Sequence, residues 1–252
     1  MSDPNQEFQP PPFAEAPAPA GETMSTPATL TGIFFEPGRV FAALRTRPRF
    51  LIAGLILVVL TAAVVGVLYM RIDMGEFIRS QMDKSPQAAQ LTSEQKEQRV
   101  KIGKIVGAIA FPLSIPIWIA AGAALYLLGV MAFGGSISYK QSLTVWVYSS
   151  LPPAVFGTFV AILVLFLKAK DSIDPEHILV TNPGAFMGPD SSPVLVAALS
   201  QFDLLRFYGL FLAALGLRKI AKLSSGSAWG IVIGFYVIRA VFAVSRAAIF
   251  GG

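Results

Sequence analysis

The sequence contains no cysteine and a single histidine, His177. Without cysteine the chain can form no disulfide, no thiolate metal site and no cysteine nucleophile. A Ser-His-Asp triad would have to use His177, and a metal site built on two histidines is excluded. Because His177 lies in a polar loop, we interpret it as a solvated side chain. We therefore expect neither a bound metal nor a cofactor.

Charge is also scarce. Charged residues make up 14% of the 252 residues, and hydrophobic residues make up 54%, with a mean hydropathy of +0.63. Soluble domains carry about 25% charged residues, so this composition predicts an integral membrane protein. The surplus of Lys and Arg, which gives a net charge of +5, is therefore not interpreted as a nucleic-acid footprint. The partners expected from composition are the lipid bilayer and no nucleic acid.

The first part of the chain has a different composition. Residues 1–32 are rich in Pro and Ala, and residues 1–30 contain no Lys or Arg. Such a segment has too little apolar surface to offset the entropy lost on folding, which predicts a disordered tail over residues 1–32. It has neither the basic start nor the apolar centre of a signal peptide. Residues 33–252 are predicted to form one transmembrane domain.

Five apolar runs predict an all-α domain with five transmembrane helices. About 20 helical residues cross the hydrocarbon core, because a helix rises about 1.5 Å per residue. The second and third runs each contain two prolines, which predict kinked or tilted helices. Thr92 and Gln95 have the spacing of a capping box that opens the second helix. The five runs are residues 50–70, 105–133, 143–167, 194–217 and 228–250.

A short amphipathic helix is predicted just before the first run. Pro37 suits a first helical turn, and the helix should end before Pro48. Apolar residues recur between them at helical spacing. We expect this helix to lie in the headgroup layer, where its basic side chains would contact anionic lipid. The candidate lipid contacts are Arg39, Arg45, Arg47 and Arg49.

Lys and Arg residues are almost evenly divided between the two sides of the predicted membrane domain. The positive-inside rule weighs short loops and the flanks of the first span most heavily. Those positions favour a cytoplasmic N-terminus. The Ala- and Arg-rich composition suits the cytoplasmic membrane of a bacterium.

Three charges inside the apolar runs are candidates for function. Asp203 and Arg206 are three residues apart and share a helix face, and Arg239 lies in the next run. A charge in the bilayer centre costs about 2.5–3.5 kcal/mol on insertion scales. One interpretation is a structural ion network that fixes helix packing. The alternative is a site for an anionic group, such as a lipid phosphate, because two arginines face one carboxylate.

Other motifs carry less chemistry. Gly230 and Gly234 form a small-xxx-small pattern, which makes them candidates for close helix packing. No phosphate-binding loop, dinucleotide fingerprint or pair of catalytic acids is recognisable. We therefore expect no enzyme activity.

Three stretches of the chain carry a family resemblance. They are Phe35-Glu36-Pro37 with Phe41, Leu44 and Pro48; Ser138 to Leu143 with Tyr148 to Pro152; and Asp203-Leu204-Leu205 with Leu212 and Leu215 to Leu217. Together they resemble the Yip1-domain family of integral membrane proteins, in its bacterial form. The resemblance implies a five-helix membrane domain with a cytoplasmic N-terminus. In eukaryotes, similar proteins bind prenylated Rab GTPases and one another. Those proteins carry an Asp-Leu-Tyr-Gly-Pro motif that is absent from this chain.

Two functions follow as expectations. The first is a non-enzymatic adaptor that organises membrane or cytoplasmic protein partners through its tail, its basic helix and its bundle. The alternative is a transporter or lipid-handling protein that uses Asp203, Arg206 and Arg239, with anionic lipid as a ligand.

Overall fold

The computed structural model describes residues 23–83, 90–170, 173, 178, 181–188 and 190–250, and the regular structure in these residues is helical. This confirms the all-α prediction. The predicted tail is described only from residue 23 onward, and His177 lies outside the described residues. The helices are α1 (Thr26–Phe35), α2 (Pro37–Thr46), α3 (Leu51–Arg71), α4 (Met74–Asp83), α5 (Ser93–Ala132), α6 (Tyr139–Leu167), η3 (Pro183–Phe186), α7 (Pro193–Leu199), α8 (Leu204–Ile220) and α9 (Ser225–Phe250).

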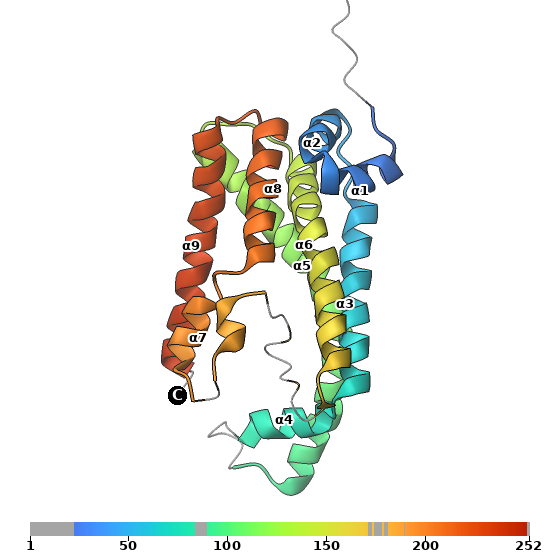
Figure 1. Cartoon of the computed structure of the whole chain (residues 1–252), viewed down its shortest axis with the longest axis vertical. Helices are drawn as coiled ribbons and strands as arrows, with labels where there is room; N and C mark the ends of the chain where they lie inside the picture. The colour runs from blue at the N-terminus through green and yellow to red at the C-terminus, as the bar shows by residue number, and fades with distance from the viewer. Residues whose placement is uncertain are drawn as a thin grey trace, which may run out of the picture.

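The bundle is built from the predicted apolar runs. Helices α3, α5, α6 and α9 are long and apolar enough to cross a membrane, and α7 with α8 makes a fifth span if the bent pair is counted as one. Figure 1 shows these helices side by side along one axis. Large apolar side chains point outward from them, including Leu51, Ile117 and Phe242, which are 70–74% exposed. A surface of this kind suits lipid rather than water.

Capping residues fix where two long helices begin. Helix α5 starts at the predicted capping box of Thr92 and Gln95, which is confirmed. Helix α6 starts at a second capping box, formed by Ser138 and Gln141, that the sequence analysis did not identify. Each box satisfies backbone N–H groups that have no partner within the helix.

Helix α4 lies at the end of the bundle opposite α1 and α2 (Figure 1). Asp73 begins it, since its carboxylate accepts the backbone N–H groups of Gly75 at 2.7 Å and Glu76 at 3.3 Å. The same oxygen accepts from Lys104 of α5 at 3.2 Å. The Gly75 N–H first, and then Lys104, hold the pKa of Asp73 below its ordinary value. The Asp73 carboxylate therefore connects the start of α4 to Lys104 of α5.

Helix α1 corrects the predicted extent of the tail. Residues 26–32 were expected to be disordered, but they are helical from the N-cap Ser25 onward. Thr29 and Ile33 are buried, and the Thr29 hydroxyl lies 3.0 Å from the hydroxyl of Tyr148 in α6. This packing offsets the entropy of ordering the segment, which the Pro- and Ala-rich composition conceals.

The amphipathic helix is confirmed as α2, but its apolar side faces protein rather than lipid. Val40, Phe41 and Leu44 are 0–1% exposed and belong to the core that α2 shares with α6 and α8. The side-chain amide of Gln141 also donates to the backbone oxygen of Arg45 at 2.9 Å. Helices α1 and α2 together, called the cap below, are thus fixed to the bundle.

Close helix packing involves one glycine of the predicted pair and another that was not predicted. Gly230 packs against the ring of Phe133, but the space around Gly234 is open within 4 Å in the described part of the chain. A role of Gly234 in helix packing stays a prediction. Gly122 of α5 lies instead directly against the ring of Trp146 in α6. That ring also packs on Tyr126, with 4.9 Å between the ring centroids.

The fourth predicted run is not one continuous helix. Helices α7 and α8 meet at an angle of 45° across residues 200–203, which we call the break. Asp203 has extended backbone angles and forms the N-cap of α8. The backbone oxygen of Thr181 accepts the N–H of Leu204 at 3.2 Å, so the segment before η3 packs on the break. Irregular backbone inside a membrane domain is stable only when protein or water satisfies its polar groups, and this segment supplies such groups.

Candidate functional site

The break brings together two positively charged side chains from different helices. The side-chain oxygen of Gln201 accepts from Nη1 of Arg206 at 2.8 Å and from Nη1 of Arg239 at 3.2 Å. The side-chain nitrogen of Gln201 donates to the backbone oxygen of Ala197 in α7 at 2.8 Å. That bond turns the Gln201 oxygen toward the arginines. The structure therefore brings Arg206 and Arg239 together, with Gln201 as the group between them.

Asp203 does not take part in the way the sequence analysis expected. Its carboxylate forms no ion pair with Arg206 or Arg239. One oxygen accepts the backbone N–H of Arg206 at 2.9 Å, and the other accepts the hydroxyl of Thr181. An N-cap side chain folds back onto the first turn of its own helix, so the hydrogen bonds of this carboxylate go to the backbone of α8 and to Thr181. The predicted network of these three residues is corrected to a cap and a separate arginine pair.

Tyr236 of α9 completes the connection between the break and the last helix. Its hydroxyl donates to the backbone oxygen of Gln201 at 2.8 Å, and its ring lies 6.0 Å from the ring of Phe207. Gln201 and Tyr236 were not among the predicted site residues, because that prediction considered only charged residues in the apolar runs. A search for any strongly polar side chain in those runs would have found Gln201.

The break divides the fourth apolar run into a longer and a shorter helix. Helix α8 extends from it toward the cap for 17 residues, which is about 25 Å. Helix α7 extends the other way for 7 residues, or about 10 Å, and ends at the polar residues 190–192. In Figure 1 the chain between α7 and α8 is level with the middle of α3. The break therefore lies within the length of the spanning helices and not at either end of the bundle.

The described residues that meet at the break include two arginines and one aspartate. Gln201 and Asp203 are 8% and 7% exposed, Arg206 is half-buried, and Arg239 is exposed on the outside of α9. A guanidinium has five N–H groups, and each arginine here uses only Nη1 for acceptors among the described residues. Their remaining donors have no acceptor in the part of the chain that the structure describes. The described residues contain no group of three or more His, Asp or Glu side chains that could hold a metal ion.

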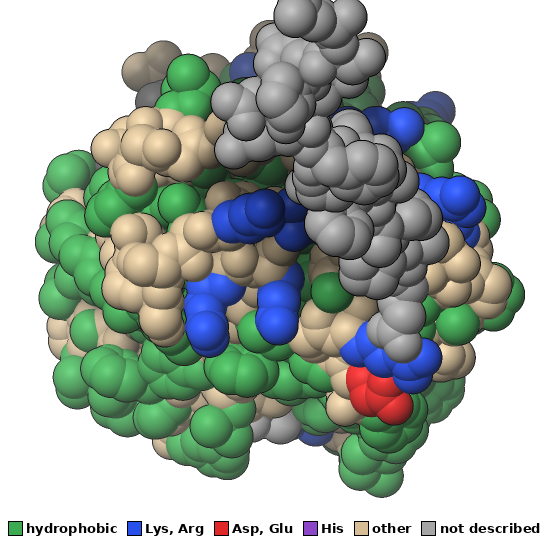
Figure 2. All heavy atoms as spheres, turned by 90° about the horizontal axis from the view of Figure 1, so that it is seen from above, with side chains coloured by type: hydrophobic (Ala, Val, Ile, Leu, Met, Phe, Trp, Pro, Cys, Tyr) green, Lys and Arg blue, Asp and Glu red, His purple; other side chains and the backbone are tan. Residues whose placement is uncertain are grey.

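The cap end of the bundle is a second basic region. Figure 2 looks onto this end and shows Lys and Arg side chains across it, with an acidic side chain at one place in the view. Arg39 forms an exposed ion pair with Glu36 at 3.1 Å, and surface pairs of this kind contribute about 0–1 kcal/mol. Arg45 is half-buried, and Arg47 is exposed.

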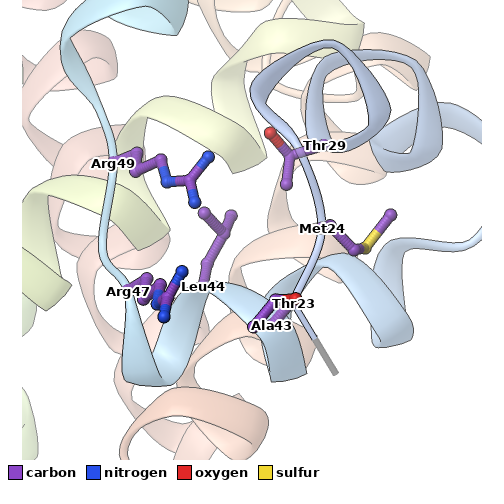
Figure 3. Close-up of a pocket in the computed structure, with 7 residues that line it drawn as sticks. All are labelled: Thr23, Met24, Thr29, Ala43, Leu44, Arg47 and Arg49. Atoms are coloured by element: carbon purple, nitrogen blue, oxygen red, sulfur yellow. The ribbon is translucent and has the colours of Figure 1, made fainter. Parts of the chain in front are cut away.

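A small pocket lies beneath the start of α1. Figure 3 shows Arg47 and Arg49 on one side of it, and Thr23, Met24 and Thr29 on the other. Nη1 of Arg49 donates to the hydroxyl of Thr26 at 3.1 Å. Two of the four predicted lipid-contacting arginines thus converge where the chain passes from the cap into the first span. The pocket is lined by Thr23, Met24, Thr29, Ala43, Leu44, Arg47 and Arg49.

Comparison with known proteins places the chain among membrane proteins. A family model described as the Yip1 domain matches residues 31–246. The chain is also similar to the membrane protein YknW of Bacillus subtilis (strain 168), with 27% identity over 231 residues that cover 88% of this chain and 91% of the relative. No solved structure matches. The matched range includes α2, the break and Arg239.

Proposed function

This chain belongs to the Yip1 domain family, and from that premise we propose that it is a non-enzymatic organiser that holds protein partners at its cap end. The observation that carries the proposal is the attachment of the cap. Phe41 and Leu44 are 0–1% exposed against the bundle, so α1 and α2 are held as one body with the spans. A fixed surface binds a partner at a lower entropy cost than a mobile one.

The outer side of the cap has side chains suited to protein recognition. Phe35, at the junction of α1 and α2, is 85% exposed, and the ion pair of Glu36 and Arg39 lies beside it. Aromatic and arginine side chains supply much of the binding energy in protein interfaces. This combination supports a protein partner at the cap.

We also propose that the cap faces the cytoplasm of a bacterial cell. Its arginines and the basic turns between later spans lie at the same end of the bundle, in short segments where the positive-inside rule applies most strongly. The residues that support this orientation are Arg39, Arg45, Arg47, Arg49, Lys140, Arg218, Lys219 and Lys222.

Orientation is tested with a reporter at each terminus. Replacing Arg45, Arg47 and Arg49 with Glu should reduce or invert the preferred orientation. The matched control replaces three exposed basic residues of the opposite end, Arg79, Arg99 and Lys101, with Glu, and should leave orientation unchanged. An unchanged topology in the cap variant would contradict the proposed orientation.

The partner proposal is tested by photo-cross-linking at native expression. A photoreactive phenylalanine analogue is placed at Phe35 and, as the control, at Phe186 of η3, which is 77% exposed and far from the cap. We expect a reproducible protein adduct from position 35 that is absent from position 186. We also expect this adduct to disappear when residues 1–22 are deleted, while membrane insertion is retained.

Two results would contradict the proposal that the cap binds a protein partner. One is the same set of adducts from both positions. The other is adducts with lipid alone from position 35.

A further inference from the structure

The proposed binding of a protein partner at the cap does not involve the arginine pair at the break. From its geometry we propose that Arg206 and Arg239 bind a phosphate-type oxyanion, supplied either by a phospholipid headgroup or by free phosphate. This site lies about 25 Å along α8 from the cap end. It is independent of the proposed partner surface.

The first argument is charge. Two guanidinium groups share one neutral acceptor, the Gln201 oxygen, at 2.8 and 3.2 Å. The carboxylate of Asp203 is already committed to the first turn of α8 and to Thr181. An exposed arginine within the apolar length of α9 costs several kcal/mol unless an anion or water compensates it. A bound anion would remove that cost.

The second argument is geometry. A guanidinium presents its donors in a planar fork that matches the oxygens of a phosphate. Both forks lie at one place, because both Nη1 atoms contact the same oxygen. Their other N–H groups have no acceptor among the described residues. A tetrahedral oxyanion can accept from both arginines at once.

The third argument is access. Arg239 is exposed on the outer surface of α9, so a lipid can reach it sideways from the membrane. Only α7, about 10 Å long, separates the break from the polar residues 190–192. The distance from the break along α8 to the cap end is about 25 Å. A headgroup in the leaflet opposite the cap is therefore the nearer source of a phosphate.

The experiment uses the full chain, purified from phosphatidylglycerol-containing membranes in mild detergent. Native mass spectrometry measures the fraction of protein that retains this lipid. We expect Arg239→Gln to lower that fraction about tenfold, because the variant loses a charge-assisted hydrogen bond to the phosphate. The matched control is Arg246→Gln, an exposed arginine seven residues further along the same helix, which should keep the lipid.

A second variant separates binding from folding. Gln201→Glu places a carboxylate between the two arginines, so the protein should fold normally while its own side chain excludes the ligand.

Thermal unfolding of lipid-depleted protein in phosphate, compared with chloride at equal ionic strength, tests free phosphate as the source. Stabilisation of the parent and of Arg246→Gln, but not of Arg239→Gln or Gln201→Glu, would assign the site to free phosphate.

Retained lipid without stabilisation by phosphate would assign the site to a headgroup. Equal loss of lipid in Arg246→Gln and Arg239→Gln would overturn the site, because it would indicate general attraction to basic residues. The absence of both lipid retention and phosphate stabilisation in the parent would also overturn it.

Discussion

Arg206 of α8 and Arg239 of α9 donate to the same oxygen atom, the side-chain oxygen of Gln201, at 2.8 and 3.2 Å. Two like charges from separate helices are thus held together by one neutral amide. The amide is held in turn by Ala197 of α7. Helices α7, α8 and α9 are therefore connected through the side chain of one buried glutamine.

Substitutions of Gln201 should change stability in opposite directions. Gln201→Leu removes the shared acceptor and should lower the free energy of unfolding by about 1.5–3 kcal/mol, as for a hydrogen bond to a charged group. Gln201→Glu should raise the unfolding temperature, because its carboxylate would pair with both arginines. Thermal unfolding in detergent measures both effects. Equal destabilisation by the two variants would contradict the shared contact.

Substitutions of Asp203 should show that its role is capping rather than charge. Asn is as good an N-cap as Asp, so Asp203→Asn should keep the break intact. Asp203→Ala should cost about 0.5–2 kcal/mol and increase hydrogen exchange at the amide of Arg206. A variant Asp203→Asn that retained stability but lost a transport activity would favour the transporter alternative instead.

The contact between α5 and α6 should not tolerate a methyl group at Gly122. A Cβ there would overlap the ring of Trp146, so Gly122→Ala should lower the free energy of unfolding by about 1–3 kcal/mol. The matched control is Gly66→Ala in α3, where no neighbouring atom lies within 4 Å in the described structure. The control should be neutral or slightly stabilising, because Ala favours a helix over Gly. Similar losses in both variants would indicate a general effect of removing glycine.

The start of α4 should weaken in acid. The folded pKa of Asp73 is lower than its ordinary value of 3.8, so its stabilising effect is complete above that value. The effect should be lost as the pH falls through the folded pKa. Hydrogen-exchange protection at Gly75 and Glu76 measures it, and Asp73→Asn should remove the pH dependence. The N-cap residue of α5 is the uncharged Thr92, so hydrogen-exchange protection at the start of α5 should not change with the titration of Asp73.

The spans were predictable because their signal is long and simple. A run of about 20 apolar residues has few alternatives to a transmembrane helix, so α3, α5, α6 and α9 follow from hydropathy. The amphipathic spacing around Phe41 likewise predicted α2. It could not distinguish a lipid-facing helix from one packed on protein, because both bury the same apolar stripe.

The site was only partly predictable, because its central contacts depend on a change in backbone direction. An Asp inside an apolar run resembles a buried charge, whereas here it ends one helix and starts another. The same ambiguity hid α1, where Ser25 caps a helix in a Pro- and Ala-rich stretch. In both places a local capping residue outweighed the composition of the surrounding window.

The bent span also constrains how the protein is made. Helix α7 has only 7 residues, but α7 and α8 together are long and apolar enough to count as one span. The hydrogen bonds from Tyr236 and Arg239 to Gln201 can form only once α9 is available. These contacts of the break are therefore completed only after the last span has been synthesised. Ribosome-bound chains that end before α9 should expose the segment around residues 190–203 to quality-control proteases.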